Sequence, residues 1–238
     1  SYLTGEISNA DYVLLHGLPL DSQSWHGLEN ELHGNVLRAD LPDHGRSGGT
    51  PPAPLPWMKS LMQTCKSRPT IIAHSIGCEY ALKYAMAHPD TVSNIVLISP
   101  FFLQKQASLL MQNPPILGAI VKLAGAAKIL KQATGLPDEK NPLIASAVTN
   151  LQRPGKIRRF ANELARVSKP ALRDELREAL KSIQVPVTII VGENDRLLES
   201  AFHHKTHIIQ KSGHNPQLAN PKQLAKIISS INQSSLHG

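Results

Sequence analysis

The sequence predicts an α/β protein with a mostly parallel central sheet, helices on both faces of that sheet, and a helical insertion. Short apolar runs rich in β-branched residues alternate with amphipathic segments over residues 1–100, and the alternation resumes after residue 185. Strands that alternate with helices form right-handed βαβ units, which gives a parallel sheet with covered faces. Over 101–184 the apolar spacing is helical throughout. We expect a core made of residues 1–100 and 185–238 and a helical cap at 101–184.

The composition is that of one large globular domain. Of 238 residues, 41% are hydrophobic and 18% charged, and a chain of this length buries roughly 70% of its unfolded surface. Two cysteines, Cys65 and Cys78, are too few for a disulfide framework. The start of the chain lacks the pattern of a signal peptide, and the most apolar long segment, 116–130, is interrupted by two lysines. These features favour free thiols and a cytoplasmic location.

The first hundred residues divide into strands and helices at turn signals. A segment rich in Gly and Pro, 48–56, is expected to be a loop. Ser24 is the expected cap of the first helix. The expected elements are an edge strand within 1–8, strand 12–15, helix 25–32, strand 36–39, helix 57–66, strand 70–72, helix 78–88 and strand 92–99.

After residue 100 about four helical segments follow one another, separated by Pro-containing breaks. Two strands then return, at 187–191 and 206–210, and a closing helix is expected at 221–232. Each of these strands runs into a polar loop, Gly192-Glu193-Asn194-Asp195 after the first and Ser212-Gly213-His214 after the second.

The stretch Pro69–Ala81, PTIIAHSIGCEYA, has the order apolar run, small residues around a serine, helix. This is the context of a nucleophile elbow, in which a strained turn lifts the serine hydroxyl clear of the sheet. Strand and helix nearly touch there, which requires small residues two positions before and after Ser75, and Ala73 and Gly77 meet this need. An ordinary serine in a βα loop is the alternative.

A serine hydroxyl needs a basic histidine beside it and an acid that orients the histidine. The chain resembles the α/β-hydrolase superfamily over nearly its whole length, through the motifs LLHGLP, DLPDHGRS, AHSIG, GENDR and SGHNP. In that family the order along the chain is serine, acid, histidine. The resemblance therefore implies Ser75, Asp195 and His214 as the catalytic triad. It also implies the backbone N–H groups of Leu18 and Ile76 as the oxyanion hole.

Other polar residues near these motifs have competing interpretations. Glu193 is the alternative acid, with Asp195 then merely capping a turn. The group His203, His204 and His207 contains an i, i+4 pair that could bind a metal, but a solvated helix face at the rim of the site is favoured. His16 and His44 are expected to form structural hydrogen bonds, and His74 to pack rather than react. No metal and no cofactor is expected.

The sequence departs from the family pattern at three places. Asp43 stands where glycine is usual in the loop DLPDHG, and aspartate tolerates a left-handed conformation better than most residues. The 19 residues from Asp195 to His214 leave room for at most a short helix. The N-terminal part of the sheet is short, and the edge that this leaves could serve dimerisation.

Positive charge is concentrated in the expected cap. Residues 101–184 hold 14 of the 25 Lys and Arg but six of the 18 Asp and Glu, a net charge of +8, whereas the rest of the chain carries −1. A solvated face and a surface for an anionic carrier, an acyl-carrier protein or CoA, are both open interpretations, with Arg158 and Arg159 as candidate contacts. Nucleic acid is disfavoured because aromatic residues, at 4%, provide no stacking platform.

Small family members with a helical cap include esterases and eliminating lyases, so the fold does not fix the reaction. The predicted function is that of a serine hydrolase that cleaves a carboxylic ester or thioester through an acyl-enzyme on Ser75. A lyase, eliminase or cyclase in which the same triad abstracts a proton is the first alternative. A binding protein without catalysis is the second, and the intact set of three groups argues against it.

Overall fold

A computed structural model describes residues 2–5, 8–48, 53–66, 68–105, 112–125, 128, 142–199 and 206–234. Its centre is a seven-stranded sheet with the order β1-β3-β2-β4-β5-β6-β7. Only β1, at one edge, is antiparallel to its neighbour, and the other strand pairs are parallel. The predicted α/β class with a mostly parallel sheet is therefore confirmed. The strands are β1 (Leu3–Gly5), β2 (Tyr12–Leu15), β3 (Val36–Ala39), β4 (Thr70–His74), β5 (Asn94–Ile98), β6 (Val187–Gly192) and β7 (Thr206–Ile209).

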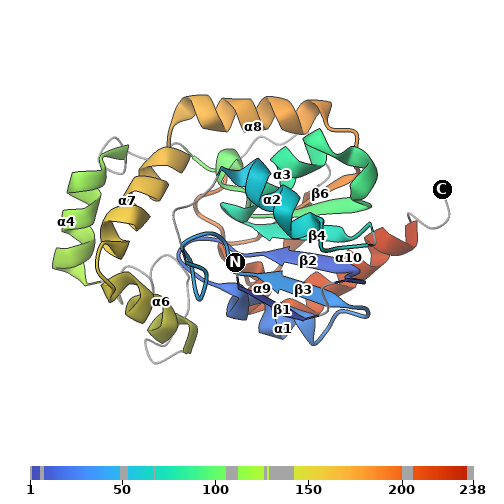
Figure 1. The fold of residues 1–238 in the computed structure, drawn as a ribbon, viewed down its shortest axis with the longest axis horizontal. Helices are drawn as coiled ribbons and strands as arrows, with labels where there is room; N and C mark the ends of the chain where they lie inside the picture. Colours follow the sequence, from blue (N-terminus) through green and yellow to red (C-terminus); the bar gives the residue numbers. More distant parts are fainter. Residues whose placement is uncertain are drawn as a thin grey trace.

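Helices cover both faces of the sheet (Figure 1). Alternate side chains of each strand point to opposite faces, so two apolar clusters form. In β4, Ile71 packs with α2 (Pro54–Met62) and α3 (Gly77–Ala87), while Ile72 packs on the other face with α1 (His26–Glu29) and α10 (Pro221–Ser234). The central strands β2, β4 and β5 are buried along their whole length.

The strand order fixes where a ligand can bind. From β2 the chain turns one way to β3, and β4 then lies on the other side of β2. In open parallel sheets, ligands bind outside the carboxyl ends of the strands at such a reversal. The loop after β2 contains Leu18, and the turn after β4 contains Ser75. The two therefore meet at the reversal point, which is the expected position of a binding cleft.

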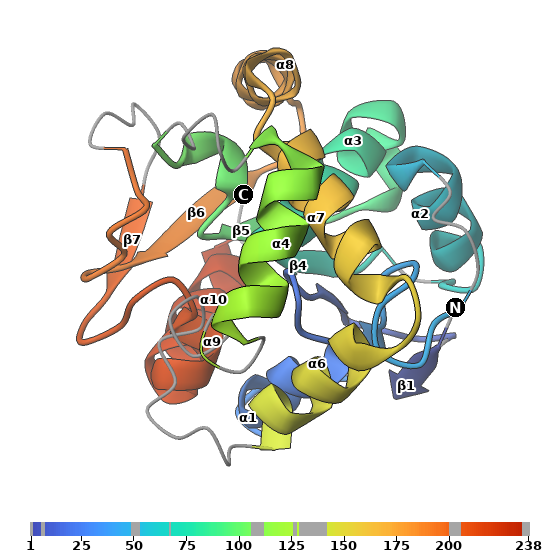
Figure 2. The ribbon, with the colours of Figure 1, turned by 90° about the vertical axis from the view of Figure 1, so that its left-hand side faces the viewer.

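Between β5 and β6 the chain forms a helical insertion, by which we mean residues 114–182. The helices in its described parts are α4 (Pro114–Ala124), α6 (Pro142–Gln152), α7 (Lys156–Val167) and α8 (Pro170–Ser182). Helix α7 packs between α4 and α6 beyond the end of the sheet, and α8 returns across α3 towards β6 (Figures 1 and 2). The insertion therefore stands over one end of the sheet and is joined to its α2–α3 face through α8.

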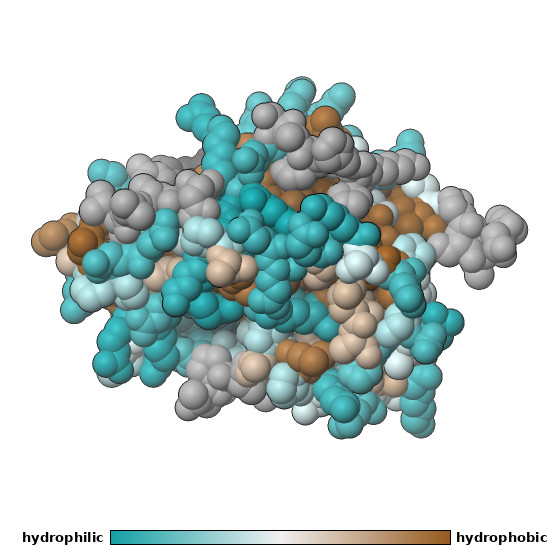
Figure 3. All heavy atoms as spheres, turned by 90° about the horizontal axis from the view of Figure 1, so that it is seen from above, coloured by the Kyte–Doolittle hydropathy of each residue, from teal (hydrophilic) through white to brown (hydrophobic). Residues whose placement is uncertain are grey.

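The outer face of α4 exposes apolar side chains. Ile116, Ile120 and Leu123 are exposed there, Leu123 by 88%. Viewed from above, apolar atoms gather at the end of the molecule where α4 lies, whereas the surface around them is mainly hydrophilic (Figure 3). Among the described residues, none of the helices combines the length and the apolar character needed to cross a bilayer.

Some predicted elements differ from the observed ones at their ends. In place of the first predicted helix, 25–32, the chain forms a 3-10 turn, Ser22–Trp25, followed by the short α1. The cap of the 3-10 turn is Asp21 rather than Ser24, because the Asp21 carboxylate accepts a hydrogen bond from the Gln23 N–H at 2.9 Å. The helix predicted at 57–66 is α2, which begins three residues earlier at a proline. His207 lies in β7 and not on a helix face, while His203 and His204 lie outside the described residues.

Candidate active site

Ser75 occupies the turn between β4 and α3 with a left-handed backbone conformation, φ 51°. A residue with a side chain adopts this region rarely, and such strain is typical of functional turns. The Ser75 N–H donates to the Ile98 carbonyl at 2.9 Å, which holds the turn against β5. At Gly77 a Cβ atom would lie 2.7 Å from the Leu15 carbonyl oxygen, so the helix approaches β2 as closely as the elbow prediction requires.

The loop after β2 passes next to Ser75. A Cβ atom on Gly17 would lie 2.8 Å from the Ser75 Cβ atom, so only glycine allows this approach. In the part of the chain that the structure describes, the N–H groups of Leu18 and Ile76 donate to no acceptor. Ile76 also precedes the first turn of α3, where N–H groups point towards an incoming negative charge. Within the described residues both N–H groups are therefore unpaired near Ser75, and their role as an oxyanion hole stays a prediction.

Asp195 and His214 meet at the carboxyl ends of β6 and β7. The Nδ1 atom of His214 lies 3.0 Å from Oδ2 of Asp195. Close backbone contact brings the two loops together: the Asn194 N–H donates to the Ser212 carbonyl, and a Cβ on Gly192 would collide with Gly213. A neutral His214 that donates from Nδ1 leaves Nε2 as an acceptor.

Glu193, the alternative acid, has a different partner. Its carboxylate accepts a hydrogen bond from the Lys211 N–H at 2.9 Å. Lys211 has a left-handed backbone, φ 54°, so this bond stabilises the turn that leads towards His214. Of the two acids in the loop, the structure brings only Asp195 into contact with the histidine.

The Asp195 carboxylate stays ionised although its side chain is only 1% exposed. Burial by itself raises the pKa of Asp195, but the hydrogen bond and charge of His214 and the hydrogen bond from the Leu197 N–H outweigh it, and the pKa lies below its usual value. Gln104 adds a further polar group, because its amide nitrogen lies 3.3 Å from His214 Nδ1 and 3.3 Å from the Ser99 carbonyl oxygen. The acid is therefore set to hold an orienting negative charge next to His214.

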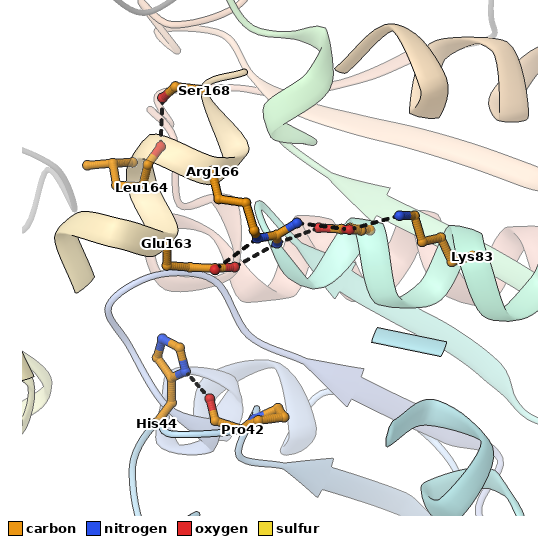
Figure 4. Close-up of polar contacts among 8 residues, drawn as sticks. Pro42, His44, Lys83, Glu163, Leu164, Arg166 and Ser168 are labelled. Carbon is orange, nitrogen blue, oxygen red and sulfur yellow. Dashed lines mark hydrogen bonds and ion pairs between the residues drawn. The ribbon is translucent and has the colours of Figure 1, made fainter. Parts of the chain in front are cut away.

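Three buried histidines near the site are neutral. Burial lowers the pKa of His16 and of His74 to about 3, and it lowers the pKa of His44 as well. His16 accepts the Leu41 N–H at 2.9 Å, and His44 lies 2.9 Å from the Pro42 carbonyl (Figure 4). These two bonds hold the loop after β3.

His74, next to the serine, does more than pack. With Nε2 protonated, it donates to the His214 carbonyl oxygen at 2.9 Å, and the two imidazole rings lie 5.0 Å apart. The sequence alone did not indicate this link between the elbow and the histidine loop. Gln104 also gave no signal, whereas Ser99 follows β5 directly and could have been found from the sheet order.

A pocket of about 370 Å³ opens beside Leu18. Its walls come from the loops after β2 and β3, from Tyr80 of α3, and from α6 and α7 of the helical insertion. Arg166 of α7 reaches back to α3, where it binds the buried Glu79 at 2.7 Å, and it also binds Glu163 (Figure 4). Burial lowers the pKa of Arg166, but these two carboxylates raise it more strongly. The insertion is thus fixed to the elbow helix by charge.

The basic residues of the insertion fall into two groups. Lys156 and Arg159 are paired with Asp43, at 2.6 and 2.8 Å. Arg153 and Arg158 are exposed, and within the described ranges neither forms an ion pair. They line a second groove, of about 630 Å³, together with Lys122, and it shares Leu151 and Asn162 with the pocket beside Leu18. Of the two predicted carrier contacts, Arg158 faces this groove, whereas Arg159 is engaged by Asp43.

The alternative of a metal at His203, His204 and His207 is not tested, because the first two lie outside the described residues. Within the part of the chain that is described, no three His, Cys, Asp or Glu side chains are grouped as metal ligands would be. Of the two thiols, Cys78 is buried and Cys65 half-buried, and both are free.

Comparison with known proteins defines the class. The model of the alpha/beta hydrolase family matches residues 12–227, so the chain belongs to this family, and the resemblance drawn from its five motifs is confirmed. The pimeloyl-[acyl-carrier protein] methyl ester esterases of Salmonella newport and Salmonella heidelberg are each 27% identical to this chain over 95% of both sequences. Membership of this family makes the chain an alpha/beta hydrolase, and the two relatives are named as methyl ester esterases.

Solved structures agree on the fold. Cfl2 from Burkholderia cenocepacia has a TM-score of 0.77 at 16% identity and covers 96% of this chain and 90% of its own. The thioesterase domain from the curacin biosynthetic pathway has a TM-score of 0.67 at 21% identity, with coverages of 95% and 93%. At these identities the likeness concerns the fold alone.

Proposed function

We propose that this protein is a serine hydrolase that cleaves a carboxylic ester or thioester through an acyl-enzyme on Ser75. The observation that carries the proposal is a set of groups at the carboxyl ends of β4, β6 and β7, where His74, next to Ser75, bonds to the His214 carbonyl oxygen. A serine in a left-handed elbow turn lies beside two unpaired N–H donors, and a histidine is held through Nδ1 by a buried carboxylate 3.0 Å away. This set of groups supplies a nucleophile, an oxyanion hole and an oriented base, which are the parts that acyl transfer needs.

In the proposed reaction, Nε2 of His214 takes the proton of the Ser75 hydroxyl as Oγ attacks the carbonyl carbon. The negative charge that develops on the carbonyl oxygen is held by the N–H groups of Leu18 and Ile76. Asp195 stabilises the resulting imidazolium, which then gives its proton to the departing alcohol or thiol. Water, activated by His214, breaks the acyl-Ser75 bond and restores the enzyme.

An acyl group attached to an anionic carrier is the proposed physiological substrate. The relatives named above act on an ester of an acyl-carrier protein, and this chain presents Lys122, Arg153 and Arg158 around a groove that continues towards the proposed active site. Cations without internal partners attract a carrier's phosphate or acidic surface. CoA esters share the phosphate and are the second carrier to be tested.

The decisive experiment is detection of the covalent intermediate. The protein is mixed rapidly with p-nitrophenyl acyl esters, acyl-CoAs and acyl-carrier-protein methyl esters, and release of the alcohol or thiol is followed with mass spectrometry of the peptide that contains Ser75. We expect a burst equal to the enzyme concentration and an acyl adduct on Ser75. Turnover without a burst and without an adduct would instead support proton abstraction by the same groups, the lyase alternative.

A further inference from the structure

The pocket beside Leu18 contains many charged groups, yet every cation in its wall is already paired. Lys156, Arg159 and Arg166 line it. Asp43 binds the first two at 2.6 and 2.8 Å, and Glu79 and Glu163 bind the third at 2.7 Å each. Three positive charges thus face three carboxylates, and burial keeps the neighbouring His44 neutral by lowering its pKa.

Asp43 is the residue on which this balance depends. Its backbone is left-handed, φ 66°, in the loop after β3, and its side chain is only 11% exposed. From this position one carboxylate serves two cations of α7, and its carbonyl oxygen also accepts a hydrogen bond from Lys156. A glycine at this position would leave Lys156 and Arg159 without a counter-charge at the pocket wall.

Two neutral polar groups of the same pocket differ from these charged ones. Within the described residues, the side-chain amide of Asn150 and the hydroxyl of Tyr80 form no hydrogen bond with another group of the protein. Tyr80 is protonated, because burial and the nearby Glu163 raise its pKa. A ligand that brings donors and acceptors of its own could pair with both. A ligand carboxylate would lose its hydration without gaining a free cation, which is unfavourable.

We propose that Asp43 is a specificity-determining residue: by engaging Lys156 and Arg159 it selects substrates whose group in this pocket is neutral and hydrogen-bonding. Such a group is a chain that ends in an amide, ester or hydroxyl rather than in a carboxylate. The inference rests on the proposed function in one respect, that the pocket beside Leu18 holds the part of the substrate next to the reacting carbonyl.

The test measures binding, so that it does not depend on turnover. Ser75→Ala protein is titrated by calorimetry with three methyl esters of equal chain length that end in a carboxamide, a carboxylate or a methyl group. We expect the carboxamide to bind at least about tenfold more tightly than the carboxylate. Adding Asp43→Asn, which keeps the shape and tolerates the left-handed backbone, should tighten carboxylate binding about tenfold and change carboxamide binding less than about threefold.

Two further variants make the result specific. Glu163→Gln removes a different carboxylate from the pocket and should also tighten carboxylate binding relative to carboxamide binding. The shift should be smaller, because Arg166 remains paired with Glu79. This variant replaces Asp43→Asn in the test if that substitution lowers the melting temperature too far. Asp174→Asn removes an exposed carboxylate of α8 that is paired with Arg177, and should leave the preference unchanged. Tighter binding of the carboxylate by the Ser75→Ala protein, or an unchanged preference after Asp43→Asn and Glu163→Gln, would overturn the role of Asp43. Absence of hydrolysis of all three esters by the wild-type protein would count against the proposed function instead, because the binding preference is measured separately.

Discussion

The sheet and the helical insertion hold their side chains in place by different means. In the sheet, β4 and β5 are fully buried, and the groups proposed to react are fixed by backbone geometry, such as the turn at Ser75 and the contact of Gly192 with the loop before His214. In the insertion, α7 has only three fully buried residues, Ala161, Ala165 and Val167. Val167 of α7 and Leu176 and Leu180 of α8 join the apolar core of the sheet, and ion pairs through Asp43 and Glu79 add to this attachment.

Because of this difference, the position of the reacting groups and the substrate preference depend on separate parts of the molecule. Backbone geometry in a close-packed interior leaves little freedom, so the position of the reacting groups is insensitive to changes on the surface. Ion pairs between a loop and a helix can be exchanged one residue at a time, which allows the substrate preference to change while the chemistry is kept. Changes in the sheet should therefore act mainly on turnover, and changes in the insertion mainly on stability, binding and association.

The largest effect is expected at the serine. Ser75→Ala should lower kcat by about 10⁵-fold or more on any ester that the wild-type protein hydrolyses, because no other group can form the acyl-enzyme. Unfolding by urea should be nearly unchanged, since the side chain lies at the turn and not within the apolar clusters. A variant that retains a tenth of the wild-type kcat would show that Ser75 is not the nucleophile.

The two acids of the loop after β6 give the next largest contrast. Asp195→Asn should lower kcat by about 10⁴-fold with little change in KM, because an amide cannot stabilise the His214 imidazolium or fix its tautomer. Glu193→Gln is the matched control, with the same change of group two residues away, and should cost less than about threefold since its carboxylate contacts the Lys211 N–H. The reverse ranking in steady-state kinetics would reassign the acid.

The ion pair between Arg166 of α7 and the buried Glu79 of α3 tests how the insertion is attached to the core. Glu79 is 1% exposed, so Arg166→Met should lower the free energy of unfolding by about 3 kcal/mol, towards the lower end of the usual range because Lys83 remains 3.2 Å away. Adding Glu79→Gln should recover part of this loss, because no unpaired carboxylate is then buried. Lys181→Met is the control: it removes an exposed pair with Glu178 and should cost less than about 1 kcal/mol. Equal losses for the buried and the exposed pair in urea unfolding would contradict the proposed attachment.

The sequence predicts the sheet and its loops far better than it predicts the contacts of the helical insertion. The strand Thr70–His74, the elbow at Ser75 and the loops that bear Asp195 and His214 follow from local patterns, because apolar runs and small residues specify close-packed strands and turns wherever they occur. The pairs of Asp43 with Lys156 and of Glu79 with Arg166 join residues 113 and 87 positions apart. No local pattern encodes such a pairing, so the excess of basic residues was visible but its neutralisation was not.

The buried histidines of the core make stability depend on pH. In the unfolded chain His16 and His74 titrate near 6.5, whereas in the native protein their pKa is about 3. Between these values the unfolded state binds more protons, so the free energy of unfolding falls as the pH decreases from 6.5 and is level above about pH 7. Each histidine should contribute about 1.4 kcal/mol per pH unit. Urea unfolding at pH 7.5, 6.5 and 5.5 measures how steeply the free energy of unfolding changes with pH. His74→Gln should reduce this slope by about 1.4 kcal/mol per pH unit, the contribution of one histidine. An unaltered slope would mean that His74 is protonated in the native protein.

The smallest effect is expected on the outer face of the insertion, where Arg153 and Arg158 form no ion pair with any described residue. Arg153→Glu combined with Arg158→Glu should lower kcat/KM for a carrier-linked ester about tenfold at low salt, since exposed charges act on the association rate and are screened as salt increases. Arg159 is left intact because a glutamate there would face Asp43 and disturb the neutral pocket. A p-nitrophenyl ester of the same acyl group should change less than about twofold.

The matched control carries the same change of charge on a helix of the core. Lys222→Glu combined with Lys226→Glu alters two exposed residues of α10, the helix that packs on the face away from α2 and α3. If this control slows the carrier-linked substrate as much as the insertion variant does, net charge and not a carrier surface explains the effect. A tenfold loss of kcat/KM that occurs only in the Arg153 and Arg158 variant and vanishes at high salt would place the carrier at the groove beside α4. The acyl chain attached to the carrier would then occupy the pocket beside Leu18.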